Sequence, residues 1–271
     1  CFTMKQKLVR LSTDFSRVIE AQGVFNFRDF GGYKAKDGAR LRTGLLYRSG
    51  DHSQATKQDQ VQTKALGLAS WVDLRSLKER SRKPNRVWSD PNIKHISAPS
   101  YQAQNAPHLW QPSGVVTVDS VRQGLLGAFR TLPFDPPLIE AFRMCIMALA
   151  ESSGATLVHC TAGKDRTGMA VALVHSLLGV HRDDIYADFL LTNTAGDRVA
   201  RFQSLAPLVR EMWGGNVSDE AVQAALDVEA AYLDAFFGEL EARANGISRY
   251  VSDVLCLSSD TVEKLEQRLF E

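Results

Sequence analysis

The 271-residue chain lacks the long apolar run of a membrane-spanning protein. No stretch reaches the roughly 18 apolar residues that a spanning helix needs. The best candidate, residues 169–180, is short and contains His175 and Ser176. Near the N-terminus, basic residues are followed by polar residues 12–14, where a signal peptide would have its apolar core. We therefore expect no membrane insertion, and a protein that is cytoplasmic or exported without a recognisable signal peptide.

Cysteine is scarce, and its spacing excludes two classes of protein. None of the four cysteines forms a C-x-x-C pair or stands at zinc-ligand spacing with the six histidines. So few cysteines in so long a chain also argue against a disulfide framework. We expect no metal, and buried reduced thiols as the default; the four are Cys1, Cys145, Cys160 and Cys256.

An excess of charge is also missing. The formal net charge is +1, so there is no global footprint for nucleic acid, and any anion must be recognised at a local site. Hydrophobic residues make up 44% and charged residues 23%, which is ordinary for a globular protein. The sequence has no internal repeat, and no pattern in it predicts an oligomeric state.

What the chain does contain is an alternation of short β-rich runs and helical patterns, which predicts an α/β fold with a central, mostly parallel sheet. Asp135 before Pro136 is typical of a helix start, and residues 166–178 form an apolar helix that Gly179 can end. The predicted strands are residues 44–48, 69–74, 93–98 and 156–159.

Helical patterns dominate after residue 182. We predict one domain over residues 1–271, with an α/β core at about 20–180 and a helical elaboration at about 182–271. Ser218 is expected to cap one long helix, whose apolar stripe reaches Leu240. The helices after residue 196 are expected to form a lid, because Leu233, Phe236, Phe237 and Leu240 need a surface to cover; a layer packed away from the site is the alternative. Residues 99–135 are predicted to be irregular.

The chemistry is expected in the run from His159 to Gly168, His-Cys-Thr-Ala-Gly-Lys-Asp-Arg-Thr-Gly. Cys160 and Arg166 make a C-x5-R pattern, which occurs too easily by chance to decide anything alone. Its context decides more, because an apolar strand ends at His159 and a helix begins near Arg166. A strand, a short loop and a helix N-terminus turn backbone N–H groups around an oxyanion.

Each part of this run suits a phosphate monoester. Loop amides can stabilise the charge on the phosphoryl oxygens, and Arg166 can hold two of them with its planar fork. The same field favours the thiolate of Cys160, which can attack phosphorus. The hydroxyl of Thr167 could stabilise the thiolate when it leaves. The alternatives are a buried inert thiol and an ordinary first-turn threonine.

The run resembles the signature loop of the protein-tyrosine-phosphatase superfamily. It is most similar to the bacterial atypical tyrosine and lipid phosphatases, which include secreted mycobacterial and listerial enzymes. Further segments resemble motifs of that group across about residues 24–269, although the resemblance is thin at 99–130. They are Phe25-Asn-Phe-Arg-Asp-Phe-Gly-Gly-Tyr33, Leu46-Tyr-Arg-Ser49, Val72-Asp-Leu-Arg-Ser76 and Asp188-Phe-Leu-Leu-Thr-Asn193.

The resemblance implies turnover through a cysteinyl-phosphate on Cys160, without metal or other cofactor. Members with Lys and Asp in the loop, as at Lys164 and Asp165, act on phosphotyrosine and on phosphoinositides, so a phosphorylated protein or a phosphoinositide is the expected substrate. Lys164 suits a second phosphate, and the alternative is a solvated lysine at the rim. The expected substrate-binding residues are Thr161, Ala162, Gly163, Lys164, Thr167 and Gly168.

A proton donor is needed for a poor leaving group. The chain has no Trp-Pro-Asp tripeptide, which supplies this acid in many superfamily members. Asp165 is the best placed by sequence, and a carboxylate that only orders Arg166 is the alternative. Asp119, Asp29 and Asp73 are further candidates.

A second group of polar residues lies at or near the ends of predicted strands. A buried ion-pair network that supports the site is the simplest reading, although Asp29 and Arg75 could touch a ligand. The group is His159, Arg28, Asp29, Arg48, Asp73 and Arg75.

The sequence therefore predicts a cysteine-dependent phosphatase of phosphotyrosine, with possible activity on phosphoinositides. The alternatives are an enzyme that acts mainly on phosphoinositides and, against the intact Cys160 and Arg166, an inactive phospho-ligand binding module. A rhodanese-like sulfur transferase fits the loop less well, and a zinc role for His159 and Cys160 lacks partner ligands.

Overall fold

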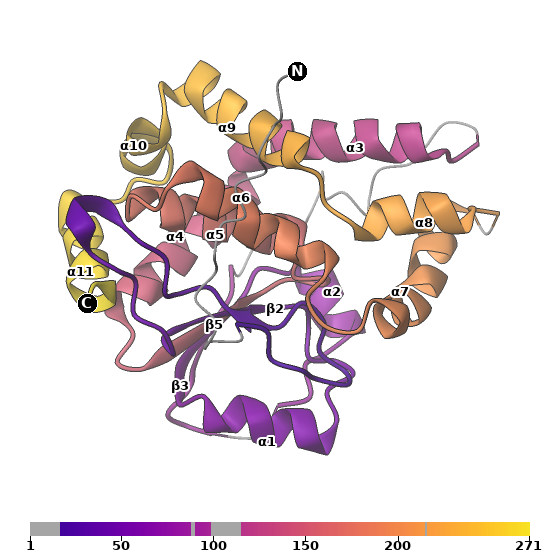
Figure 1. The fold of residues 1–271 in the computed structure, drawn as a ribbon, viewed down its shortest axis with the longest axis horizontal. Helices are drawn as coiled ribbons and strands as arrows, with labels where there is room; N and C mark the ends of the chain where they lie inside the picture. Colours follow the sequence, from indigo (N-terminus) through magenta and orange to yellow (C-terminus); the bar gives the residue numbers. More distant parts are fainter. Residues whose placement is uncertain (1–16, 88–89, 99–114, 215) are drawn as a thin grey trace, which may run out of the picture.

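A five-stranded sheet lies at the centre of the computed structural model, which describes residues 17–87, 90–98, 115–214 and 216–271 (Figure 1). The strand order is β1-β2-β5-β3-β4; β1 is antiparallel to β2 and all other neighbours are parallel. The strands are β1 Arg28–Asp29, β2 Leu46–Ser49, β3 Leu68–Asp73, β4 Lys94–Ile96 and β5 Ala155–His159. The predicted α/β fold with a mostly parallel sheet is confirmed.

Alternation along the strands sends side chains to both faces of the sheet. In β3, Trp71 joins one buried cluster and Val72 the other; in β5, Leu157 and Val158 divide in the same way. Helices α4, α5 and α6 lie over one face, and α1 lies on the opposite side (Figure 1). Because β5 is central and buried throughout, the loop that follows it starts from a rigid position.

The helices form readily from the local sequence. Helix α4 begins at Pro136 after Asp135, as predicted, and α5 is followed by Gly179 at φ +68°. The α-helices are α1 Lys57–Ala65, α2 Leu77–Arg82, α3 Val118–Thr131, α4 Pro136–Glu151, α5 Asp165–Leu177, α6 Arg182–Leu190, α7 Arg198–Trp213, α8 Asp219–Leu226, α9 Ala230–Ala244, α10 Ile247–Arg249 and α11 Ser259–Leu269. Short 3-10 turns lie at Lys36–Gly38, Leu132–Phe134 and Leu191–Asn193, and a π-turn at Tyr250–Val254.

The prediction of one long helix from Ser218 to Leu240 was wrong. The chain is extended at Asp227, and this break separates α8 from α9. Val228 explains it: its N–H donates to Oδ1 of Asn193 and its carbonyl accepts from Nδ2 of Asn193, both at 2.8 Å. A distant side chain thus replaces the hydrogen bonds that the helix would have made.

The prediction that residues 99–135 are irregular was wrong over its second half. Helix α3 spans Val118–Thr131, and Thr117 caps it through a hydrogen bond from the N–H of Ser120. Its apolar face packs against α8 and α9, and these contacts outweigh the low helix propensity of its two glycines. Residues 99–114 lie outside the described part of the chain.

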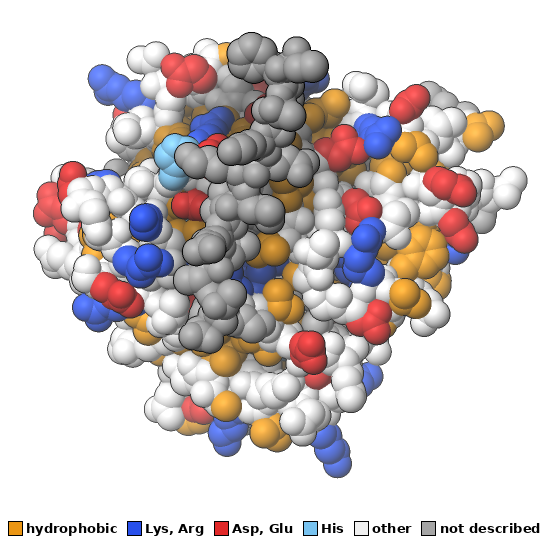
Figure 2. Space-filling view, in the orientation of Figure 1, with side chains coloured by type: hydrophobic (Ala, Val, Ile, Leu, Met, Phe, Trp, Pro, Cys, Tyr) orange, Lys and Arg blue, Asp and Glu red, His pale blue; other side chains and the backbone are white. Residues whose placement is uncertain are grey.

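No helix in the described part of the chain is long and apolar enough to cross a membrane. On the face shown in Figure 2, acidic and basic side chains are interspersed over the described surface. This mixing agrees with the near-zero net charge and leaves recognition of an anion to a local site.

Candidate active site

The loop after β5 lies at the edge of the sheet where the parallel strands end, and it leads directly into α5. Its first residue, Cys160, is 3% exposed and lines a cavity of about 190 Å³. Thr161, Ala162, Lys164 and Asp165 line the same cavity. The 13-residue helix α5 starts at Asp165, so the N–H groups of its first turn and the positive end of its dipole face the loop.

Arg166 is fixed by a carboxylate that the sequence analysis did not identify. Its Nη1 and Nη2 donate to Oε2 and Oε1 of Glu79 at 2.8 and 2.6 Å. Glu79 also accepts from the hydroxyl of Thr161 at 2.6 Å and closes the capping box of α2 with Ser76. One carboxylate therefore orients both the guanidinium and the start of the loop. The Ser-x-x-Glu spacing was the sequence signal for it.

Lys164 is not the solvated rim lysine that one interpretation predicted. Its side chain is 4% exposed, and Nζ donates to the carbonyl oxygens of Ala225 at 2.8 Å and Asp227 at 3.2 Å. These carbonyls belong to the C-terminal end of α8, where a cation is favourable. Nζ also lies 3.1 Å from Oδ1 of Asp165. Lys164 thus ties the loop to α8.

Of the four aspartates considered as proton donors, one lines the cavity and three do not. Asp165 lines the cavity. Asp119 is on α3, with a side chain 91% exposed and 3.7 Å from Arg122. Asp29 accepts the N–H groups of Gly31 and Gly44, each at 2.6 Å, which makes it a turn-holding residue. Neither Asp29, Asp73 nor Asp119 is among the residues that line the cavity.

Asp73, Arg75 and His159 form a buried network behind the loop. Nε and Nη2 of Arg75 contact Asp73 at 2.9 and 2.7 Å, and Nε2 of His159 lies 3.4 Å from Oδ2 of Asp73. Although burial alone would raise it, His159 and Arg75 hold the pKa of Asp73 below its ordinary value. Burial lowers the pKa of His159, and Asp73 offsets part of that shift. Arg75 also lines the cavity.

Two glycines of this segment stand where a side chain would clash, and one threonine has a buried hydroxyl. Gly163 has φ +64°, and a Cβ there would lie 2.3 Å from the backbone of Ser49. A Cβ on Gly168 would lie 2.7 Å from the ring of Phe189, so this glycine lets α5 approach α6. The Thr167 hydroxyl is buried and has no hydrogen-bond partner among the described residues.

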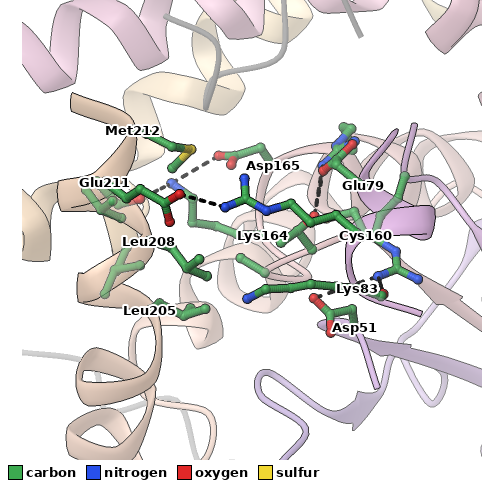
Figure 3. A pocket seen from close by; sticks show the side chains of 18 of the residues that line it. Asp51, Glu79, Lys83, Cys160, Lys164, Asp165, Leu205, Leu208, Glu211 and Met212 are labelled. Carbon is green, nitrogen blue, oxygen red and sulfur yellow. Dashed lines mark hydrogen bonds and ion pairs between the residues drawn. The ribbon is translucent and has the colours of Figure 1, made fainter. Parts of the chain in front are cut away.

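The opposite wall of the cavity is apolar and comes from the C-terminal helices. Leu205, Leu208 and Met212 of α7 face the loop across the cavity, and α8 adds Ala225 and Leu226 (Figure 3). Sequence periodicity could not assign these residues to a site, because nothing local relates α7 to residue 160.

The prediction that C-terminal helices cover the site named the wrong residues. Helices α7 and α8 line the cavity, whereas Leu233, Phe236, Phe237 and Leu240 of α9 are buried in the core. Helix α9 packs on α3 and α6, so its apolar face is buried against these helices and does not cover the cavity.

Charged residues also line the cavity. Asp51, Lys83 and Arg82 line the side formed by the α/β core, and Nη2 of Arg82 pairs with Glu211 of α7 at 2.8 Å. Both side chains of this pair are more than half exposed. None of these residues was predicted from the sequence, which offers only isolated charges at these positions.

Comparison with known proteins identifies the family. A profile described as the tyrosine phosphatase family matches residues 19–271. A protein of Cupriavidus necator, whose name places it among the tyrosine-protein phosphatases, is 34% identical over 236 residues, covering 86% of this chain and 82% of its own. The triple specificity protein phosphatase PtpB of Mycobacterium tuberculosis is 27% identical over 92% of this chain and 97% of its own. The chain therefore belongs to the tyrosine phosphatase family, as the resemblance of its motifs predicted.

Proposed function

We propose that this protein-tyrosine phosphatase hydrolyses phosphotyrosine through a cysteinyl-phosphate on Cys160, and that it also accepts phosphoinositides. The observation that carries the proposal is the position of Cys160, which lines a cavity at the N-terminus of α5 beside Arg166. The apolar wall of α7 and α8 supports a substrate with a ring or chain next to its phosphate.

The first half-reaction requires a nucleophile, an anion cradle and an acid. The thiolate of Cys160 attacks phosphorus, an S–P bond forms, and the ester P–O bond breaks. Loop amides and Arg166, held by Glu79, stabilise the equatorial oxygens. The leaving oxygen takes its proton from Asp165, which lines the cavity at the first position of α5.

In the second half-reaction, the Asp165 carboxylate takes a proton from water, which attacks phosphorus. The S–P bond then breaks, releasing inorganic phosphate and the Cys160 thiolate. Thr167 supports this release, because its buried hydroxyl has no partner among the described residues and can donate to the sulfur. His159, Asp73 and Arg75 hold the end of β5 from behind.

Substrate profiling of the purified protein tests the assignment. We expect turnover of a phosphotyrosyl peptide and of short-chain phosphoinositides, and its loss in Cys160→Ser with phosphate-ligand binding retained. Turnover of phosphoinositides alone would make the protein mainly a lipid phosphatase. Binding of phosphotyrosine without turnover by the wild type would make it a binding module, and equal turnover by Cys160→Ser would refute the role of Cys160.

A further inference from the structure

The carbonyl of Gly163, in the middle of the loop, is held by two buried side chains. It accepts Nδ2 of Asn26 at 2.6 Å and Nη2 of Arg48 at 2.9 Å. The two donors come from segments far apart in the sequence, and both are at most 1% exposed. The two donors together use both lone pairs of this carbonyl, so its direction is fixed from two sides.

Because the peptide bond is planar, the direction of the Gly163 carbonyl also fixes the direction of the next N–H group. In a trans peptide the carbonyl and the following N–H point in opposite directions. Holding the Gly163 carbonyl toward Asn26 and Arg48 therefore sets the direction of the Lys164 N–H, on the opposite side of the loop. The backbone of Ser49 lies close to Gly163, since a Cβ on this glycine would come within 2.3 Å of it.

The two donors are themselves held by an ion-pair cluster. Oδ2 of Asp188 pairs with Nη1 of Arg48 at 2.6 Å, and Oδ1 lies 3.3 Å from Nε of Arg28. Arg28 also donates to Oδ1 of Asn26, which leaves Nδ2 of that amide directed at Gly163. Burial would raise the pKa of Asp188, but Arg28 and Arg48 hold it well below its ordinary value, so the cluster stays charged.

A purely stabilising role explains this arrangement poorly. Burying three charges costs desolvation energy, and well-packed apolar residues often stabilise a core as well or better. The residues of the cluster belong to three of the motifs identified in the sequence, at residues 25–33, 46–49 and 188–193. Both of its hydrogen bonds to the loop end on the same oxygen.

We propose that Asn26 and Arg48, held in place by Arg28 and Asp188, are positioning residues that turn the Gly163–Lys164 peptide so that its N–H faces the bound phosphoryl group. They do not touch the substrate and act through the loop. This inference rests on the proposed function, since it assumes that the loop binds a phosphoryl group.

The isosteric change Asn26→Asp tests it, because it keeps the shape and the acceptor for Arg28 and removes the donor to Gly163. Losing one oxyanion donor costs about 10²–10³-fold in kcat, and a misdirected donor should cost about 10- to 100-fold. We expect kcat/KM for a phosphotyrosyl peptide to fall by that factor, and the inhibition constant of vanadate to rise in parallel. Arg48→Lys should give the same losses, because one lysine ammonium cannot reach both Asp188 and the Gly163 carbonyl.

Val24→Ala is the matched control, because Val24 is two residues from Asn26, is buried in the hydrophobic cluster of Trp71 and Leu157, and is not one of the two donors to the Gly163 carbonyl. If Val24→Ala lowers the melting temperature as much as Asn26→Asp does, kcat/KM and the inhibition constant of vanadate in Val24→Ala should still lie within twofold of wild type. Wild-type kinetics and vanadate affinity in Asn26→Asp and Arg48→Lys would overturn the proposal. So would an equal loss in Val24→Ala.

Binding of inorganic phosphate in the Cys160→Ser background separates the two proposals. We expect calorimetry to show binding that weakens about 10-fold or more when Asn26→Asp is added. If the wild type proves inactive but this difference holds, the proposed function fails and the positioning role stands. Equal binding by the single and double variants would overturn the positioning role, even in an active enzyme.

Discussion

At the scale of single residues, Asp165 and Glu79 are two carboxylates of one cavity with different surroundings. Glu79 is held by Arg166, Thr161 and Ser76, so its oxygens are already engaged. Asp165 has one neighbouring cation, Lys164, and its Oδ1 lacks a hydrogen bond of good geometry among the described residues. Of the two, Asp165 is therefore better placed to exchange a proton with a substrate.

The change Asp165→Asn should separate an acid from a carboxylate that only shapes the loop. Asn keeps the shape and removes the proton, so the loss should grow with the pKa of the leaving group. We expect little loss on nitrophenyl phosphate and a larger one, approaching about 10²–10⁴-fold, on a phosphoinositide, whose alkoxide leaves worst. The basic limb of the pH–rate profile should flatten.

A uniform loss across leaving groups would contradict this role. The acid would then be sought at Asp51 or Glu211, which line the cavity and do not hold Arg166 as Glu79 does. Asp29, Asp73 and Asp119 do not line the cavity. Asp51→Asn distinguishes the candidates: if Asp165 is the acid, the change at Asp51, whose carboxylate accepts the N–H of Ser53, should affect all leaving groups alike.

At the scale of elements, Lys164 and Glu211 attach the C-terminal helices to the core in two ways. Lys164 is buried and holds carbonyls at the end of α8, whereas the pair of Glu211 with Arg82 is exposed. Exposed pairs contribute about 0–1 kcal/mol, and hydrogen bonds of buried charged groups contribute about 1.5–3 kcal/mol. The buried contact should therefore dominate the position of α8.

The change Lys164→Met should consequently loosen α8 over the cavity. We expect amide hydrogen exchange in Asp219–Leu226 to accelerate about tenfold for each 1.4 kcal/mol of lost local stability. Glu211→Gln is the control, with exchange in α8 close to wild type. Equal exchange in both variants would show that apolar packing alone holds α8.

Which elements could be predicted from the sequence depended on whether the signal was local. Apolar runs placed β2, β3 and β5 within two residues, and the Asp135-Pro136 pair placed the start of α4. Cys160 and Arg166 were found because strand, loop and helix are consecutive. The break between α8 and α9 depends on Asn193, and the α7 wall depends on packing, so neither leaves a local pattern. The catalytic roles of the site residues stay a prediction. So does the division of the chain into a core and a helical elaboration near residue 182.

At the scale of the whole molecule, three buried histidines link stability to pH. Burial lowers the pKa of His52, His159 and His175 in the folded protein. The unfolded chain therefore binds protons that the folded chain does not, beginning near the ordinary value of about 6.5. Stability is full above that pH and is lost as the pH falls below it.

We expect the melting temperature to fall steadily between pH 7 and pH 5. The slope can reach about 1.4 kcal/mol per pH unit for each histidine. Asp188 adds a further loss only below about pH 3.8, because its folded pKa is depressed. His175→Asn should lower stability at pH 7 and flatten the slope, because it removes one of the three buried imidazoles. An unchanged slope in His175→Asn would contradict this origin.

In the proposed mechanism, Cys160 carries the phosphoryl group during turnover. Rapid acid quenching of a reaction with a ³²P-labelled phosphotyrosyl peptide measures this most directly, because a phosphocysteine survives the quench and can be located by peptide mapping. We predict label on the peptide that contains Cys160, accumulating further if water attack is slowed in Asp165→Asn, and no label in Cys160→Ser. Full turnover with no labelled enzyme, or label on a residue other than Cys160, would show that Cys160 does not carry the phosphoryl group.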